Sequence, residues 1–126
     1  MSNLKEIRVK EVGLILDKER HLRYDLNAIS EIEETFGDIQ VALTLVEKMN
    51  SKAIKNLLWA GLIHEEINED GTYNITERQV GSWIGIGNIA DISHLIVEAF
   101  GQALPNEKKP EPSLIEMQRK TQTKKK

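Results

Sequence analysis

The order of elements between residues 14 and 64 constrains the fold more than any other feature of this chain. The stretch begins with LILDKERHLRYDLNAISEIEETFG and ends with AIKNLLWAGLIH. This pattern predicts a short β-hairpin that runs directly into a capped helix, followed by two more helices with apolar faces. The stretch contains no catalytic motif.

A hairpin is predicted where apolar residues take alternate positions on both sides of a polar turn at residues 17–20. The alternating residues are Val12, Leu14, Leu16, Leu22 and Tyr24. The turn has no Asn-Gly or Asp-Gly pair, which would define its type. Because an isolated two-stranded hairpin is only marginally stable in water, this one must pack on the helices or pair with another chain.

Capping residues and glycines mark the first three helices. Asp25 is the expected N-cap of the first helix, which Gly37 closes. A second helix follows and breaks at residues 49–50. Ser51 is the expected N-cap of the third helix, and Gly61 lies near its end.

Two further helices are expected after a loop at residues 69–71. Thr76 and Gln79 have the spacing of a capping box and begin a short helix. The last helix runs from about residue 88 to residue 104 and carries the longest apolar stripe of the chain, until Pro105 stops it. The expected fold is therefore mainly α (α+β), with an N-terminal β-hairpin followed by a bundle of about five helices.

Charge divides the chain into an acidic body and a basic tail. Residues 1–104 hold 10 Lys and Arg against 17 Asp and Glu, whereas residues 105–126 hold 7 against 3. We expect one helical domain over residues 1–104, since domains commonly have about 100–150 residues. Because binding to phosphate backbones draws on Lys and Arg, nucleic-acid binding through the acidic body is not expected.

The tail, residues 105–126, is predicted to be disordered in the free protein. Its sizeable apolar residues are Leu114, Ile115 and Met117. Burying all three yields roughly 5–9 kcal/mol, whereas ordering about eight residues around them costs about 12 kcal/mol. The tail is therefore expected to fold only on a partner.

Secretion and membrane insertion are not expected. No apolar run approaches the roughly 20 residues that span a bilayer. The N-terminus also lacks the apolar core of a signal peptide. These features predict a soluble, intracellular protein.

The candidate catalytic, cofactor-binding and metal-binding motifs are better explained as structural features of the fold. The chain has no cysteine, which excludes thiolate chemistry and Cys-ligated metals. His64 precedes two glutamates, but Asn68 stands where a metalloprotease motif needs a second histidine, which favours a solvated helix end. Residues 85–87, Gly-Ile-Gly, match half of a phosphate-binding loop but follow a helix, which favours a flexible break between helices. We therefore assign no catalytic, cofactor-binding or metal-binding residue and do not expect an enzyme.

Four segments of the chain carry a family resemblance. They are HLRYDLNAISEIEETFG, IKNLLWAGLIHEE, ITERQVGSWIG and EAFGQALP, and the resemblance covers most of residues 12–104. The most specific motifs among them are Arg23-Tyr24-Asp25 and the run from Leu58 to Leu62. In order and pattern the chain resembles the tail assembly chaperones of long-tailed bacteriophages, in the group that includes a gene-transfer-agent tail protein.

The resemblance implies a small, largely helical protein that acts in the cytoplasm of a bacterial host during virion morphogenesis and is absent from the mature virion. Such chaperones bind the tail tape-measure protein, keep it soluble and help recruit tail-tube subunits. The edge strand of the hairpin favours a homo-oligomer. The resemblance also implies a longer form made by ribosomal frameshifting, and the A-rich codons of Lys124-Lys125-Lys126 suit such a site. A basic, solubilising tail explains the same lysines.

An apolar groove between helices suits the apolar helical faces of a tape-measure protein. We expect the last helix and the segment before it to form this groove. The candidate partner-binding residues are Trp59, Leu62, Trp83, Ile84, Leu95, Ile96 and Phe100. Both tryptophans also fit a role in core packing, although tryptophan is enriched at interface hot spots. The alternative function is a small regulatory adaptor or nucleic-acid-associated protein that acts through its basic tail.

Overall fold

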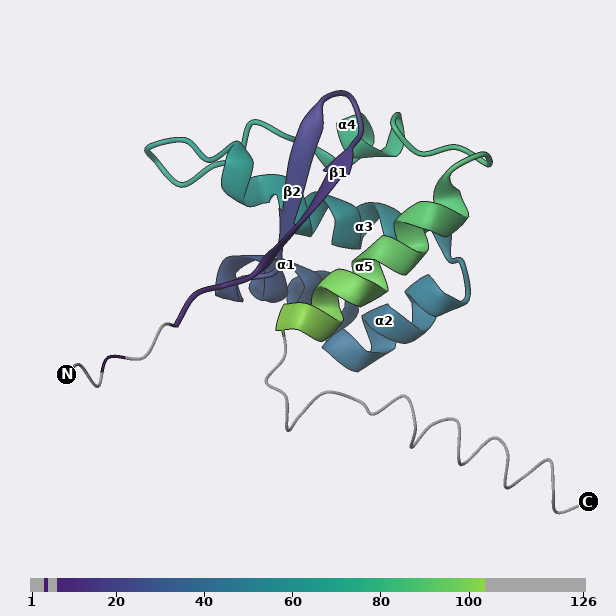
Figure 1. Ribbon diagram of the computed structural model, residues 1–126, viewed down its shortest axis with the longest axis horizontal. Helices are drawn as coiled ribbons and strands as arrows, with labels where there is room; N and C mark the ends of the chain where they lie inside the picture. Colours follow the sequence, from purple (N-terminus) through teal and green to yellow (C-terminus); the bar gives the residue numbers. More distant parts are fainter. Residues whose placement is uncertain (1–3, 5–6, 104–126) are drawn as a thin grey trace, which may run out of the picture.

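The structure of the protein, a computed structural model, describes residue 4 and residues 7–103. A two-stranded antiparallel β-hairpin is followed by five α-helices, as the sequence predicts (Figure 1). The elements are β1 (Glu11–Ile15), β2 (Glu19–Arg23), α1 (Leu26–Phe36), α2 (Ile39–Glu47), α3 (Ser51–Leu62), the 3₁₀ turn η1 (Ile63–Glu65), α4 (Glu77–Gly81) and α5 (Ile89–Ala103). The tail predicted to be disordered, residues 105–126, lies outside the described residues.

The hairpin turn is shorter than predicted. Glu19 and Arg20 belong to β2 rather than to the turn, because the pairing of the two strands extends to Ile15 and Glu19. Asp17 braces the turn, since its two carboxylate oxygens accept hydrogen bonds from the Arg20 guanidinium at 2.7 and 3.0 Å. The polar residues of this segment therefore form a strand whose side chains find partners elsewhere in the fold.

Side chains cap α1 and α4 where the sequence predicts. The Asp25 carboxylate accepts a hydrogen bond from the Ala28 N–H at 3.0 Å. Thr76 and Gln79 form a reciprocal capping box, in which each side chain accepts from the other residue's backbone N–H. Each cap satisfies N–H groups that have no partner inside the helix.

The N-cap of α3 is Asn50, one residue earlier than predicted. Its side-chain oxygen accepts a hydrogen bond from the Ala53 N–H at 2.9 Å, so Ser51 is the first helical residue. Met49, just before the cap, has a φ of 63°, which turns the chain between α2 and α3. Asparagine caps a helix as well as serine does, so residue type alone did not distinguish Asn50 from Ser51 as the N-cap.

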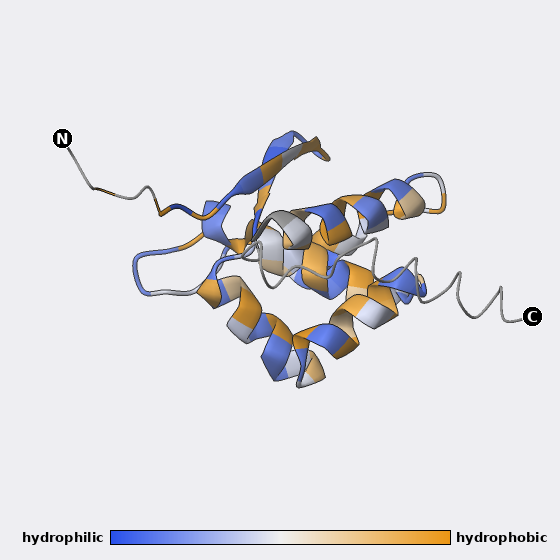
Figure 2. Cartoon of the chain, turned by 60° about the horizontal axis from the view of Figure 1, so that its bottom comes forward, coloured by the Kyte–Doolittle hydropathy of each residue, from blue (hydrophilic) through white to orange (hydrophobic). Residues whose placement is uncertain are grey.

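The helix α3 lies at the centre of the fold and packs against β2, α1, α2, α4 and α5 (Figure 1). Eight of its 12 residues are buried, so partners surround it on most sides. On the helices around it, hydrophilic and hydrophobic residues alternate, as burial of one face requires (Figure 2). One core therefore connects the hairpin with all five helices.

The hairpin packs on α3 through the buried side chains of Leu22 and Tyr24. The Tyr24 hydroxyl donates a hydrogen bond to the Leu57 carbonyl at 2.7 Å. The centroid of the Tyr24 ring lies 4.2 Å from that of the Phe100 ring. Gly61 permits this approach, because a Cβ there would lie 2.8 Å from a Leu22 methyl and 2.9 Å from the Tyr24 ring. The glycine near the end of α3 is thus a contact point for the hairpin.

Candidate partner-binding groove

A loop between α4 and α5 forms one wall of a groove. Asn88 holds this loop, since its Oδ1 accepts a hydrogen bond from the Gly85 N–H at 2.8 Å and its Nδ2 donates to the Trp83 carbonyl at 3.0 Å. Between these anchors Ile86 is 97% exposed. The segment predicted as a flexible break is therefore a hydrogen-bonded loop that presents an isoleucine to solvent.

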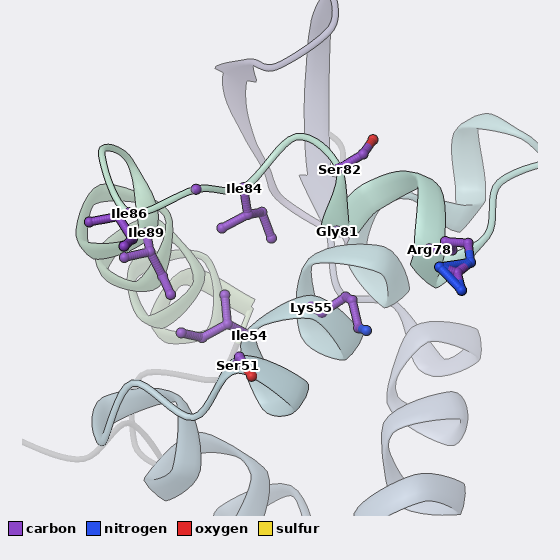
Figure 3. Close-up of a pocket in the computed structure, with 10 residues that line it drawn as sticks. Ser51, Ile54, Lys55, Arg78, Gly81, Ser82, Ile84, Ile86 and Ile89 are labelled. Carbon is purple, nitrogen blue, oxygen red and sulfur yellow. The ribbon is translucent and has the colours of Figure 1, made fainter.

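The groove has a volume of about 530 Å³ and lies between α3, α4, the loop and the start of α5. Its apolar surface comes from Ile54, Ile84 and Ile89, whose side chains converge from three parts of the chain (Figure 3). Ile54 is buried at its base, whereas Ile84 and Ile89 are half-buried and Ile86 stands at the rim. Ile84, Ile86 and Ile89 thus offer an apolar surface that is open to a ligand, above a base formed by Ile54.

Two cations, Lys55 of α3 and Arg78 of α4, also line the groove. Neither takes part in an ion pair with another residue of the range 7–101. Gly81 leaves room for the lysine stem, because a Cβ there would lie 2.8 Å from the Lys55 Cδ. The groove is therefore suited to an apolar segment that also carries carboxylates.

Of the residues predicted to bind a partner, Ile84 lines this groove. Trp83 covers Arg20 instead, with the guanidinium carbon 4.8 Å from the ring centroid. Trp59 donates a hydrogen bond from its indole nitrogen to the Ile75 carbonyl at 2.8 Å. Both tryptophans are half-buried and have structural contacts inside the chain.

The prediction of a binding surface along α5 needs correction. Leu62, Ile96 and Phe100 are 0, 0 and 2% exposed, so they are core residues that a partner does not reach in this structure. Leu95 is half-buried and packs against the same core. The reason is that α2, α3 and the hairpin already cover the long apolar stripe of α5.

Sequence reasoning missed most of the groove. It placed Ile54 in the core, where the structure also has it, and Ile89 on the apolar stripe of the last helix, and it gave no binding role to Lys55 or Arg78. One signal was present: Ile86 is an isoleucine between two glycines in a loop, where no helix or strand face can bury it. The convergence of the other residues depends on how α3, α4 and α5 pack, which no local pattern specifies.

A polar cluster lies where the hairpin meets η1. Arg20, only 4% exposed, pairs with Glu65 at 3.1 Å and Glu66 at 3.4 Å, in addition to Asp17. Hydrogen bonds from Arg20 hold the pKa of the Asp17 carboxyl below its usual value. The two glutamates predicted to form a solvated helix end therefore fasten the hairpin to the helical body.

Comparison with known proteins assigns neither a family nor a function to the chain. No protein-family model, curated protein or solved structure matches the chain. Within residue 4 and residues 7–103, no helix is long and apolar enough to cross a membrane. In the same part of the chain, no group of three or more His, Asp or Glu side chains is placed to hold a metal ion.

Proposed function

We propose that this protein is a non-catalytic bacteriophage tail assembly chaperone that binds the tape-measure protein and keeps it soluble. One observation carries the proposal: an isoleucine, Ile86, stands fully exposed on a hydrogen-bonded loop beside an apolar groove. Contiguous exposed apolar surface marks protein-binding sites, and Ile84 and Ile89 continue the apolar surface of Ile86 into the groove. The sequence resemblance suggests which partner occupies it.

The shape of the groove supports an amphipathic helix or a short apolar segment as the ligand. Ile84, Ile86 and Ile89 can contact aliphatic side chains, in the way a hydrophobic groove receives the apolar residues of a helix. Lys55 and Arg78 at the border favour carboxylates next to those side chains. A tape-measure protein offers many apolar helical segments before the tail tube encloses it.

Several copies are proposed to act together on one tape measure. In the described part of the chain, β1 and β2 form a sheet of only two strands, so each has an edge that no third strand covers. Such an edge can pair with a strand of another copy. A homo-oligomer, with or without a frameshifted longer form, then helps to recruit tail-tube subunits in the host cytoplasm.

The charge distribution supports protein binding over nucleic-acid binding by the body. Acidic residues outnumber basic ones over residues 1–104, by 17 to 10. Phosphate binding requires clustered Lys and Arg and weakens steeply with salt. An adaptor that acts through its tail instead would show salt-sensitive DNA binding that is lost when residues 105–126 are removed.

The proposal is tested by co-expression with the tape-measure protein of the same phage, followed by a pull-down from the soluble fraction. We expect the tape measure to become soluble and to co-purify with many copies of this protein per chain. A tape measure that remains insoluble while this protein stays free contradicts the proposal. The adaptor that acts through the basic tail would then be the better explanation.

A further inference from the structure

A second exposed isoleucine lies on a loop that projects from the helical body. Residues 66–74 connect η1 to α4, and Ile67 in this loop is 49% exposed. Two exposed acidic residues, Glu69 and Asp70, follow it closely in the sequence. The loop therefore presents one apolar side chain together with negative charge.

Hydrogen bonds hold this loop in one conformation. The Asn68 N–H donates to the Thr72 carbonyl at 2.7 Å. The Asn74 N–H donates to the Glu66 carbonyl, also at 2.7 Å. The Asn68 side-chain amide donates to the Thr72 hydroxyl at 2.9 Å and to the Asn74 side-chain oxygen at 3.1 Å. A loop that is already ordered loses little conformational entropy when it binds, which favours association.

The carboxylates of the loop are available to a partner. In the part of the chain that the structure describes, Glu69 takes part in no ion pair and its side chain in no hydrogen bond. Asp70 accepts from the Thr72 N–H and hydroxyl on Oδ1, so its Oδ2 accepts no hydrogen bond there. These hydrogen bonds from Thr72 hold the pKa of the Asp70 carboxyl below its usual value, so both groups carry charge at neutral pH.

The groove has the complementary chemistry. Between residues 24 and 103 the chain has 13 Asp and Glu but only four Lys and Arg. Two of these four cations, Lys55 and Arg78, line the groove and have no ion pair with another residue of the range 7–101. Its isoleucines supply the apolar surface that an isoleucine of a partner needs. The groove therefore matches both the apolar residue and the charge of the 66–74 loop.

The loop and the groove lie on opposite sides of the molecule. In Figure 1 the segment between η1 and α4 projects to the left, whereas the segment between α4 and α5, which forms a wall of the groove, lies on the right. The loop of one chain therefore does not reach the groove of the same chain in this fold. It can reach the groove of a second copy, and a contact between two different surfaces can repeat from copy to copy.

We infer that the 66–74 loop of one copy binds in the groove of the next copy. Ile67 then lies against the groove isoleucines, and the two carboxylates lie near the two groove cations. This contact is head-to-tail, so a row of copies keeps a free groove at one end and a free loop at the other. The inference rests on the proposed function in one respect, since a loop in the groove competes there with the tape-measure protein.

Sedimentation velocity of the full chain tests the contact with two variants, each of which keeps one of its two sides. The loop variant carries Ile67→Ser and Glu69→Lys, and the groove variant carries Lys55→Glu and Ile86→Ser. We expect the wild type to associate as its concentration rises and each variant alone to stay monomeric. In an equal mixture, the intact loop of the groove variant binds the intact groove of the loop variant. We therefore expect complexes of two chains and none larger.

A matched control carries Leu26→Ser and Glu98→Lys, which change an exposed apolar residue and an exposed carboxylate outside the loop and the groove. This control should associate as the wild type does. A wild type that stays monomeric up to about 1 mM, where even a very weak contact is populated, overturns the inference. Association that survives equally in both variants also overturns it, because another surface then holds the copies together. A mixture of the two variants that stays monomeric contradicts the head-to-tail arrangement.

The pull-down keeps this inference distinct from the proposed function. Because the loop variant has an intact groove but no competing loop, we expect it to bind severalfold more tape-measure protein per copy when binding sites are limiting. Equal binding by the loop variant and the wild type overturns the competition. Head-to-tail association without tape-measure binding supports the contact and contradicts the chaperone function. Tape-measure binding by a wild type that never associates overturns the contact and leaves the chaperone function standing.

Discussion

At the scale of single residues, Gly61 sets the distance between the hairpin and α3. A Cβ at this position would lie 2.8 Å from Leu22 and 2.9 Å from Tyr24, closer than real Cβ atoms approach other heavy atoms. The neighbours are packed core side chains, and Tyr24 is also fixed by its hydrogen bond to Leu57. A larger residue therefore forces the hairpin away from the helix.

We predict that Gly61→Ala destabilises the protein by about 1–3 kcal/mol, the usual cost of overpacking a core. Alanine favours a helix over glycine by about 1 kcal/mol, so the clash must exceed that gain. Gly101→Ala is the matched control, because Gly101 also lies in a helix but its Cβ would meet nothing within 4 Å. The control should gain about 0.5–1 kcal/mol. Urea unfolding measures both, and equal shifts in the same direction would contradict this role of Gly61.

At the scale of elements, the Arg20 cluster joins the hairpin to η1. The guanidinium contacts three carboxylates and lies over the Trp83 ring. The carboxylates are 20–35% exposed on their side chains, so water weakens each pair. The cluster orients the hairpin mainly because the nearly buried arginine has no other way to satisfy its charge.

Arg20→Met tests this role. The substitution leaves three carboxylates without their common partner, and we expect a loss of about 1–3 kcal/mol, less than for a fully buried pair. The pKa of Asp17 should rise toward its usual 3.8, since hydrogen bonds from Arg20 are the main cause that lowers it. Carboxyl NMR titration measures the change, with Arg20→Lys as a variant that keeps the charge but loses the two-pronged contact. An unchanged Asp17 titration would contradict the pairing.

The same contact defines a pH dependence. Because the pKa of folded Asp17 lies below its unfolded value, the carboxylate contributes stability at pH values above 3.8. That contribution disappears as the pH falls through the lower pKa of the folded state. In Arg20→Met, the part of the stability loss at low pH that comes from Asp17 should therefore be absent. Denaturant midpoints measured over a series of pH values, for wild type and variant, test this.

Trp59 ties the loop after η1 to α3. Its indole nitrogen donates to Ile75, and its ring meets Tyr73 edge to face at 5.9 Å. We predict that Trp59→Phe costs about 0.5–1.5 kcal/mol through the lost hydrogen bond. The amide of Asn74, which donates to Glu66 in this loop, should then exchange faster with solvent. Loss of tape-measure binding with unchanged exchange would instead assign Trp59 to the partner interface.

Local sequence signals predicted which helices and strands form better than they predicted which side chains are buried. The caps at Asp25 and Thr76 were readable because a cap depends on residues within three positions. The burial of Arg20 was not, because its partners Glu65 and Glu66 lie 45 and 46 residues away. For the same reason Ile96 and Phe100 were predicted to bind a partner, although elements distant in the sequence bury them.

At the scale of the whole molecule, α3 makes the hairpin and the helices one cooperative unit. Each of β2, α1, α2, α4 and α5 packs directly on it. We predict a single unfolding transition, in which tryptophan fluorescence and helical circular dichroism have the same midpoint. Trp59 and Trp83 both contribute to the fluorescence. In Trp59→Phe, where Trp83 is the remaining tryptophan, an earlier fluorescence midpoint would show that the side next to Arg20 of the hairpin unfolds separately.

The comparison of two exposed isoleucines tests the central claim, that the groove binds the tape-measure protein. Ile86 is 97% exposed at the groove, whereas Ile15 is 81% exposed on the hairpin and does not line it. Neither Ile86→Ser nor Ile15→Ser should change the stability by more than about 0.5 kcal/mol. We expect Ile86→Ser to weaken tape-measure binding about tenfold or more per site, since burying an isoleucine contributes about 1.5–3 kcal/mol. The measurement is the ratio of tape-measure protein to this protein in the soluble pull-down. A ratio that falls for Ile86→Ser alone supports the groove as the binding site, and equal ratios for wild type and both variants contradict it.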